Sequence, residues 1–247
     1  MKNIFVVKHY NITDNFFCYS DMSAVANHYK NACDIVIESA KKYLHDIDKV
    51  IIHRRTVKND QEMFKDHAEL LKELYHSEDC NILYCDLDVV FIKPTRIFGE
   101  YEDFTMIANN CGVRYYPAGG MKKHQWDIQE GWVSRWQTEF DKEQDRIHHW
   151  QYEQDMFIEM HKSVMAKHKY INPFEKVVHQ VYNPPVDGYT MVHCCGTSQQ
   201  FNGVKLMAQL YDLSLSESYN EIHNLLSERE YSERHNSDSG SPWLGLT

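Results

Sequence analysis

The stretch that decides the fold of this chain is Ile-Leu-Tyr-Cys-Asp-Leu-Asp-Val-Val-Phe, at residues 82–91. Apolar residues lead into Asp86 and Asp88, and apolar residues come after them. An apolar run of this length between polar residues is typical of a buried strand. Two carboxylates so close repel each other, so a positive group is expected beside them, and a divalent cation with oxygen ligands is the simplest candidate. Alternatively, one aspartate merely caps the turn after the strand.

Strands and helices alternate before this stretch. Residues 4–7 and 49–53 are predicted strands, with a polar loop through 13–15 after the first. Helical spacing predicts a helix from about residue 20 to residue 43 and another whose stripe includes Met63, His67 and Leu70. This alternation predicts an α/β fold with a mainly parallel central sheet flanked by helices. Ligands bind beyond the carboxyl ends of such strands, which is where Asp86 and Asp88 would lie.

The alternation breaks down after residue 103. The pattern still predicts short strands and helices, at residues 104–108, 113–116, 170–173 and 191–193 for strands, and around 126–136, 151–167, 204–212 and 216–229 for helices. No internal repeat or linker interrupts them. We therefore expect a single domain over residues 1–230 and a polar C-terminal tail over residues 231–247.

Composition limits the classes of function. The 247 residues are 43% hydrophobic, which is enough for a substantial core, and the net charge of −10 argues against a surface built to bind nucleic acid. No apolar run is long enough to span a bilayer. The seven cysteines lack the regular spacing of a disulfide framework, so a reducing, cytoplasmic location is expected.

Three further features carry possible chemistry. Asp155 lies early in a predicted helix, where it either favours the helix dipole or points at a substrate. His193 ends a short apolar strand, where it is either structural or a third metal ligand beside the aspartates. Gly119 and Gly120 form either an ordinary hairpin turn or a loop whose backbone approaches a ligand closely.

The order of these parts resembles the nucleotide-sugar glycosyltransferases of the GT-A fold, a Rossmann-like fold. Asp86-Leu87-Asp88 resembles their Asp-x-Asp segment, and residues 116–121 and 153–157 resemble the glycine turn and the acceptor-side helix found after it. His193 and Gly196 resemble the His-x-x-Gly of the glycogenin-like branch, family 8. The Lys-Pro-Trp found next in that branch is absent here, and Lys205 is the candidate for its phosphate-binding lysine.

The resemblance implies transfer of a hexose or pentose from a nucleotide sugar, with UDP expected, to a glycan, protein or small-molecule hydroxyl. It places Mn²⁺ or Mg²⁺ on Asp88 and His193, with Asp86 bound directly or through ribose and water, and a histidine ligand favours Mn²⁺. Asp155 would be the base of an inverting enzyme or lie near the reacting carbon of a retaining one, and His193 favours retention. The remaining expected donor contacts are Val7, Tyr10, Leu87, Gly119, Gly120, Gly196 and Lys205.

Two other functions fit part of the pattern. Residues 86–90 also match the nucleophile strand of haloacid-dehalogenase-type phosphohydrolases, with Asp86 as the nucleophile. That family places the motif on the first strand and adds a later acidic motif, which this chain lacks. The second alternative is a noncatalytic domain that binds a nucleotide sugar.

Overall fold

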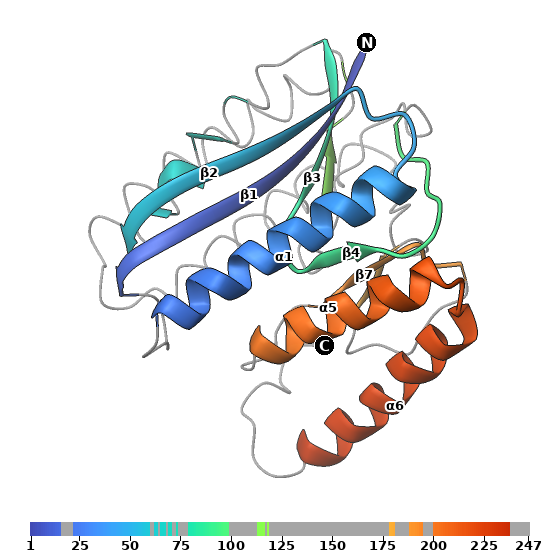
Figure 1. Ribbon diagram of the computed structural model, residues 1–247. Helices are drawn as coiled ribbons and strands as arrows, with labels where there is room; N and C mark the ends of the chain where they lie inside the picture. The colour runs from blue at the N-terminus through green and yellow to red at the C-terminus, as the bar shows by residue number, and fades with distance from the viewer. Residues whose placement is uncertain are drawn as a thin grey trace, which may run out of the picture.

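The computed structural model describes residues 1–15, 22–59, 62–63, 65–67, 69–70, 73, 79–98, 113–116, 118, 178–180, 188–194 and 200–237. Its named elements, drawn in Figure 1, are β1 (Lys2–Asn15), α1 (Met22–Tyr43), β2 (Lys49–Asn59), β3 (Cys80–Cys85), β4 (Val89–Phe91), β5 (Val113–Tyr116), β6 (Val178–Gln180), β7 (Met191–His193), α5 (Gln200–Leu215) and α6 (Tyr219–Ser237).

The larger sheet has the strand order β2-β1-β3-β5. Strand β1 runs parallel to β2 and to β3, and β5 joins the edge antiparallel to β3. Every side chain of β3 after Cys80 is buried, as expected for a strand covered on both faces. The predicted α/β fold with a mainly parallel sheet is therefore confirmed.

A smaller sheet continues directly from the larger one. Its order is β4-β7-β6, with β4 antiparallel to β7 and β6 parallel to β7. All side chains of β4 and β7 are buried. Because β3 ends at Cys85 and β4 begins at Val89, the chain passes from one sheet to the other through Asp86, Leu87 and Asp88.

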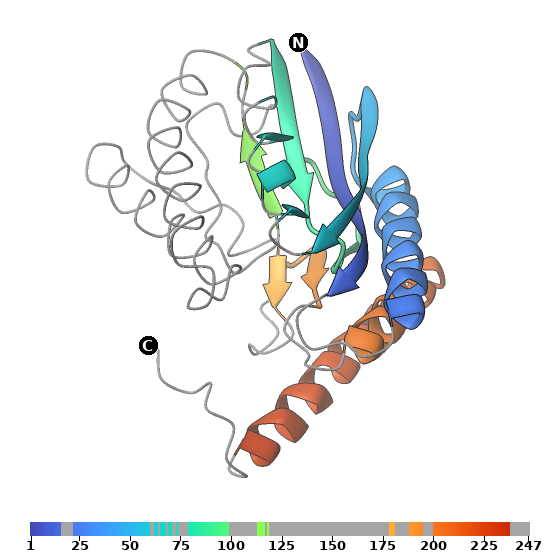
Figure 2. The same ribbon diagram turned by 90° about the vertical axis from the view of Figure 1, so that its left-hand side faces the viewer.

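One hydrophobic core joins the two sheets and the helices. Phe5, Val7, Leu83 and Cys85 of the larger sheet share this core with α1, with β4 and β7, and with α5 and α6. Figures 1 and 2 show α1 lying along one face of the larger sheet, with α5 beside it and α6 beyond. A buried hydrogen bond connects the same layers, since the Tyr43 hydroxyl donates to the Ser214 carbonyl at 2.9 Å. The single core confirms the expected single domain.

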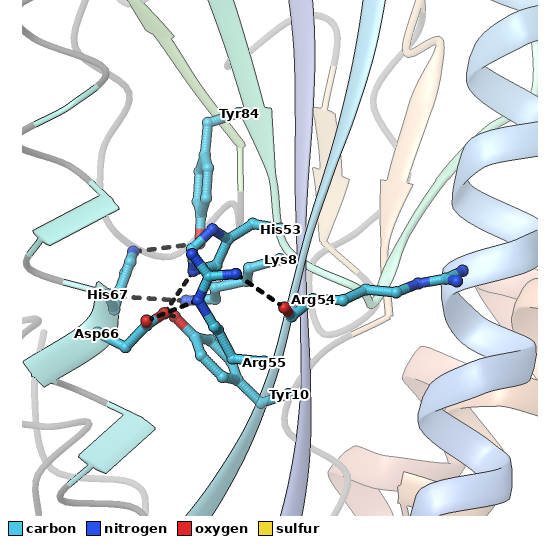
Figure 3. A network of polar contacts seen from close by, with 8 residues as sticks. All are labelled: Lys8, Tyr10, His53, Arg54, Arg55, Asp66, His67 and Tyr84. Carbon is cyan, nitrogen blue, oxygen red and sulfur yellow. Dashed lines mark hydrogen bonds and ion pairs between the residues drawn. The ribbon is translucent and has the colours of Figure 1, made fainter.

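The opposite face of the larger sheet meets the segment 62–73, whose described residues are helical. Figure 3 shows this segment across the strands from α1. Met63 packs there against Tyr10 and Val57. The described residues of the predicted stripe, Met63, His67 and Leu70, are thus helical, as the sequence predicts.

Several boundaries differ from the predictions. Strand β1 continues to Asn15, and β2 to Asn59, because the two pair well beyond their apolar starts. The residues at 13–15 are therefore strand and not loop. Strand β6 was not predicted, and α5 begins before residue 204. Helix α6 continues to Ser237, past the expected domain boundary at residue 230.

Strand 104–108, helices 126–136 and 151–167, and strand 170–173 lie outside the described residues. Strands β5 and β7 and the first helix occur where the sequence predicts them.

In the described part of the chain, no helix is both long and apolar enough to cross a membrane.

Candidate functional site

The two predicted aspartates lie in the turn that links the two sheets. Strand β3 ends at Cys85 and β4 begins at Val89, so Asp86 comes after the larger sheet and Asp88 precedes the smaller one. The carboxyl end of β3 is the edge where ligands bind in parallel α/β sheets. Both aspartates therefore lie at the strand end where the sequence places them, and each faces a different set of neighbours.

Asp88 faces His193 of the smaller sheet. Strands β4 and β7 pair Val89 with His193, and the Cys194 amide donates to the Asp88 carbonyl at 2.7 Å. This pairing brings Oδ1 of Asp88 to 3.2 Å from Nε2 of His193. The imidazole is almost fully buried, whereas the Asp88 side chain is 41% exposed. The two side chains therefore meet at the wall of the site.

Oδ1 of Asp88 is itself a buried atom for which the described residues supply no aligned hydrogen-bond donor. The His193 contact is short enough for an ion pair, but it does not have the geometry of a hydrogen bond. A buried carboxylate oxygen without a donor is costly unless another positive group satisfies it. The atom is therefore the best placed of the described carboxylate oxygens to receive a cation.

Asp86 faces the larger sheet. Because β1 and β3 are parallel with Val7 beside Cys85, the next residues, Lys8 and Asp86, are also neighbours. The Lys8 ammonium lies 3.2 Å from Oδ1 of Asp86, and the Tyr84 hydroxyl donates to the same oxygen at 3.1 Å. For Asp86, the positive neighbour that the sequence requires is thus a lysine of the chain itself.

His67 of the helical segment closes a ring of polar contacts with these residues. Its Nδ1 lies 3.5 Å from the Lys8 ammonium and its Nε2 lies 3.2 Å from the Tyr84 hydroxyl (Figure 3). Since the ammonium can only donate, Nδ1 must accept and Nε2 must carry the ring proton toward Tyr84. The Tyr84 proton then points to Asp86, so the Tyr84 hydroxyl and the Lys8 ammonium both donate to that carboxylate.

A second cluster on the same face centres on Asp66. Its carboxylate accepts from the Tyr10 hydroxyl at 2.9 Å, from Nε of Arg55 at 3.2 Å and from His53 (Figure 3). Burial alone would raise the pKa of Asp66, but the hydrogen bonds from His53 and Tyr10 and the charges of His53 and Arg55 lower this pKa overall. This cluster fastens the helical segment onto β1 and β2.

The thiol beside the aspartates is not suited to nucleophilic chemistry. Cys85, the residue before Asp86 in the chain, is fully buried in the hydrophobic core. Burial first, and then the negative charges of Asp86 and Asp88, raise the pKa of its thiol well above the usual range. Since the thiolate is the reactive form, Cys85 is a packing residue.

The donor set around Asp88 fits a divalent cation in part. Two neighbouring ligands about 2.1 Å from an octahedral cation lie about 3 Å apart, which agrees with the 3.2 Å between Oδ1 of Asp88 and Nε2 of His193. Among the described residues, no group of three or more His, Cys, Asp or Glu side chains is close enough to hold a metal ion. The full ligand set of Asp86, Asp88 and His193 therefore stays a prediction.

The other predicted donor contacts fall into different places. Val7 is fully buried against α1, so only its backbone could meet a ligand. Tyr10 is 6% exposed with its hydroxyl on Asp66, so a base could stack on its ring only after the ring moved. Leu87 packs partly against the core, and Lys205 is an exposed residue of α5. Four predicted residues, Gly119, Gly120, Asp155 and Gly196, lie outside the described residues and stay predictions.

The sequence analysis does not identify Lys8 and Tyr84 as partners of Asp86, or His67 as the residue that contacts both of them. One signal was available: Lys8 comes directly after the apolar run 4–7 just as Asp86 comes after the run 82–85. Residues just beyond the apolar cores of parallel neighbours gather at the same sheet edge. For His67 no such signal exists, because it belongs to the apolar stripe of its helix and is 1% exposed.

No protein-family model matches the chain, and no curated protein matches it. Similar solved structures include a glycosyltransferase involved in glycosylation of the major capsid of PBCV-1, with 12% identity over 83% of this chain and 98% of that chain and a TM-score of 0.45. The glycosyltransferase GlyE of Streptococcus pneumoniae TIGR4 is also similar, with 12% identity over 90% of this chain and a TM-score of 0.45. This chain spans only 64% of GlyE.

Proposed function

We propose that the chain is a metal-dependent glycosyltransferase that moves a sugar from a nucleotide-diphosphate donor, UDP-linked in the first instance, to an acceptor hydroxyl. The observation that carries the proposal is the buried Oδ1 of Asp88, which faces Nε2 of His193 at 3.2 Å beside the carboxyl end of β3. The order of the Asp-x-Asp, Glu-Gln-Asp and His-x-x-Gly motifs in the sequence supports the same activity.

The charges of the site suit a diphosphate that leaves with negative charge. Asp88 and His193 would hold Mn²⁺ or Mg²⁺, which would supply Lewis-acid neutralisation of the departing diphosphate. The Lys8 ammonium is 19% exposed at the same edge and adds a fixed positive charge next to Asp86. A low-dielectric wall made of the buried β3 and β4 residues strengthens these interactions relative to water.

The acceptor side of the reaction depends on Asp155. In an inverting reaction its carboxylate would take the proton of the acceptor hydroxyl, and in a retaining reaction it would lie beside the reacting carbon. The His-x-x-Gly resemblance favours retention. The acceptor is a glycan, a protein or a small molecule, since the net charge of −10 disfavours nucleic acid.

The phosphohydrolase alternative has less support. Its nucleophile would be Asp86, but Oδ1 of Asp86 is engaged by the Lys8 ammonium and the Tyr84 hydroxyl, and β3 is the third strand of the chain. The stronger alternative is a noncatalytic domain that binds a nucleotide sugar, because such a domain would need the same binding site for the nucleotide sugar.

The test is donor turnover. The full-length protein is incubated with a panel of UDP-, GDP- and ADP-sugars, with Mn²⁺, Mg²⁺ or EDTA, and free nucleoside diphosphate is measured with and without a broad acceptor panel. The proposal predicts release of UDP from one or a few sugars, supported by Mn²⁺ and abolished by EDTA. Binding of UDP-sugar without any release of UDP would favour the noncatalytic domain.

A further inference from the structure

The two aspartates of the Asp-x-Asp turn differ in their neighbours, although only one residue separates them. Oδ1 of Asp86 is 3.2 Å from the Lys8 ammonium and 3.1 Å from the Tyr84 hydroxyl. Oδ1 of Asp88 has no aligned donor among the described residues and faces an imidazole nitrogen. One carboxylate is therefore supplied with a cation by the chain, and the other is arranged to receive one from solution.

The Lys8 ammonium is fixed by more than its ion pair. It lies 3.5 Å from Nδ1 of His67 and 5.5 Å from the centre of the Tyr84 ring. Tyr84 is fully buried, and its ring stacks on His67 at 5.7 Å between ring centres. A lysine held by an anion, an acceptor nitrogen and an aromatic face is less able to leave than an exposed surface lysine.

We propose that Lys8 is a positioning residue that keeps Asp86 out of the metal shell and reserves this carboxylate for the donor. His67 and Tyr84 hold the lysine and the carboxylate next to each other, and Asp88 and His193 would hold the metal. This inference builds on the metal-binding part of the proposed function and divides the work of the two aspartates further. A carboxylate accepts hydrogen bonds, so the parts of the nucleotide sugar that suit Asp86 are the hydroxyls of the ribose or of the transferred sugar.

The proposal makes an unusual prediction for loss of Lys8. Removal of a positive charge beside a cation site strengthens cation binding, and removal of the ion pair also frees Asp86 to become a ligand. Lys8→Met should therefore bind Mn²⁺ more tightly, by a factor on the order of ten at low ionic strength. The same variant should lose kcat/KM for the donor, since Asp86 is no longer held for it. If Lys8 only stabilised the fold, its loss would not raise Mn²⁺ affinity while lowering kcat/KM for the nucleotide sugar.

The experiment is a Mn²⁺ titration of the full chain without nucleotide, read by electron paramagnetic resonance of free Mn²⁺, with circular dichroism to check folding. Lys49→Met is the matched control, because it removes the same charge from an exposed lysine at the start of β2, where Lys49 pairs with Ile4 and not with Lys8. Lys8→Arg keeps the charge and should bind Mn²⁺ as the wild type does. Lys8→Met should bind more tightly than all three.

A double variant decides the role of Asp86. Lys8→Met with Asp86→Asn removes both charges of the pair, so Mn²⁺ affinity should return to within about threefold of the wild type if Asp86 is not a ligand. A large loss of affinity in the double variant would show that Asp86 binds the metal directly and would overturn the proposal. Unchanged or weaker Mn²⁺ binding in Lys8→Met would also overturn it.

If Lys8→Met fails to fold, the double variant, which leaves no unpaired charge at this position, decides alone. A wild type that binds no Mn²⁺ would instead defeat the metal part of the proposed function.

Discussion

Oδ1 of Asp88 and Nε2 of His193 lie 3.2 Å apart although 105 positions, from 88 to 193, separate the two residues in the chain. The contact exists because β4 and β7 pair Val89 with His193 in the smaller sheet. Asp86, two residues earlier, instead belongs to the larger sheet through Lys8. The Asp-x-Asp turn thus gives each sheet one carboxylate, and for this reason we expect the two aspartates to have different roles.

Tyr84→Phe should impair catalysis more than stability. The substitution keeps the buried ring but removes the hydroxyl that donates to Asp86 and meets His67. Loss of such a hydrogen bond to a charged group costs about 1.5–3 kcal/mol at most. Urea unfolding should show a modest loss in the free energy of unfolding. The fall in donor turnover, converted to an activation free energy, should be larger than this loss. Tyr115→Phe is a control at another fully buried tyrosine of the same sheet, and a similar fall in its turnover would contradict a specific role for Tyr84.

Asp66→Asn should change the acid limb of the stability curve. The pKa of Asp66 in the folded protein lies below its ordinary value of 3.8, so the ionised carboxylate stabilises the fold above pH 3.8. That contribution is lost as the pH falls through the lowered folded pKa. The variant should therefore be less stable at pH 6, and the difference from the wild type should shrink at acid pH. Glu69→Gln, at an exposed carboxylate of the same segment, is the control for unfolding measured between about pH 2 and pH 6.

Lys93→Met should loosen the attachment of α6. The Lys93 ammonium lies 4.9 Å from the centre of the Tyr189 ring and 5.0 Å from that of Tyr219, the first residue of α6. Each cation–π contact of a partly exposed lysine is worth about 0.5–1 kcal/mol. We expect a loss of about 1–2 kcal/mol in urea unfolding, largely restored in Lys93→Arg. Equal losses in both variants would mean that packing of the lysine stem is what matters.

Asp155→Ala should reduce sugar transfer far more than it reduces UDP affinity. The resemblance places this residue on the acceptor side, away from the nucleotide. Transfer is measured by product formation with the accepted donor and UDP binding by calorimetry with Mn²⁺ present. Equal losses of transfer and of UDP binding would show that Asp155 belongs to the donor site.

The apolar runs of the sequence were enough to predict the buried framework. Residues 82–85 and 191–193 are buried strands, and their ends carry Asp86 and His193 as expected. The consequences of strand pairing could not be predicted, because register is set by tertiary contacts and not by local pattern. The long extensions of β1 and β2 beyond their apolar starts are of this kind.

Polar residues inside a helical stripe were equally hard to interpret. His67 fits the apolar face of its helix by spacing and by burial, yet both of its ring nitrogens meet polar groups. Asp66, the residue before it, belongs to the cluster with Tyr10 and Arg55. Only the placement of this segment on the sheet shows which polar groups these two adjacent residues contact.

The most direct test of the central claim is calorimetric binding of UDP in the presence and absence of Mn²⁺, for the wild type, Asp88→Asn and Asp79→Asn. Asp79 is an exposed aspartate just before β3, at the opposite end of that strand. The account predicts Mn²⁺-dependent UDP binding in the wild type and Asp79→Asn, and its loss in Asp88→Asn with the fold intact by circular dichroism. Mn²⁺-dependent binding of unchanged strength in Asp88→Asn would contradict the assignment of this carboxylate to the metal.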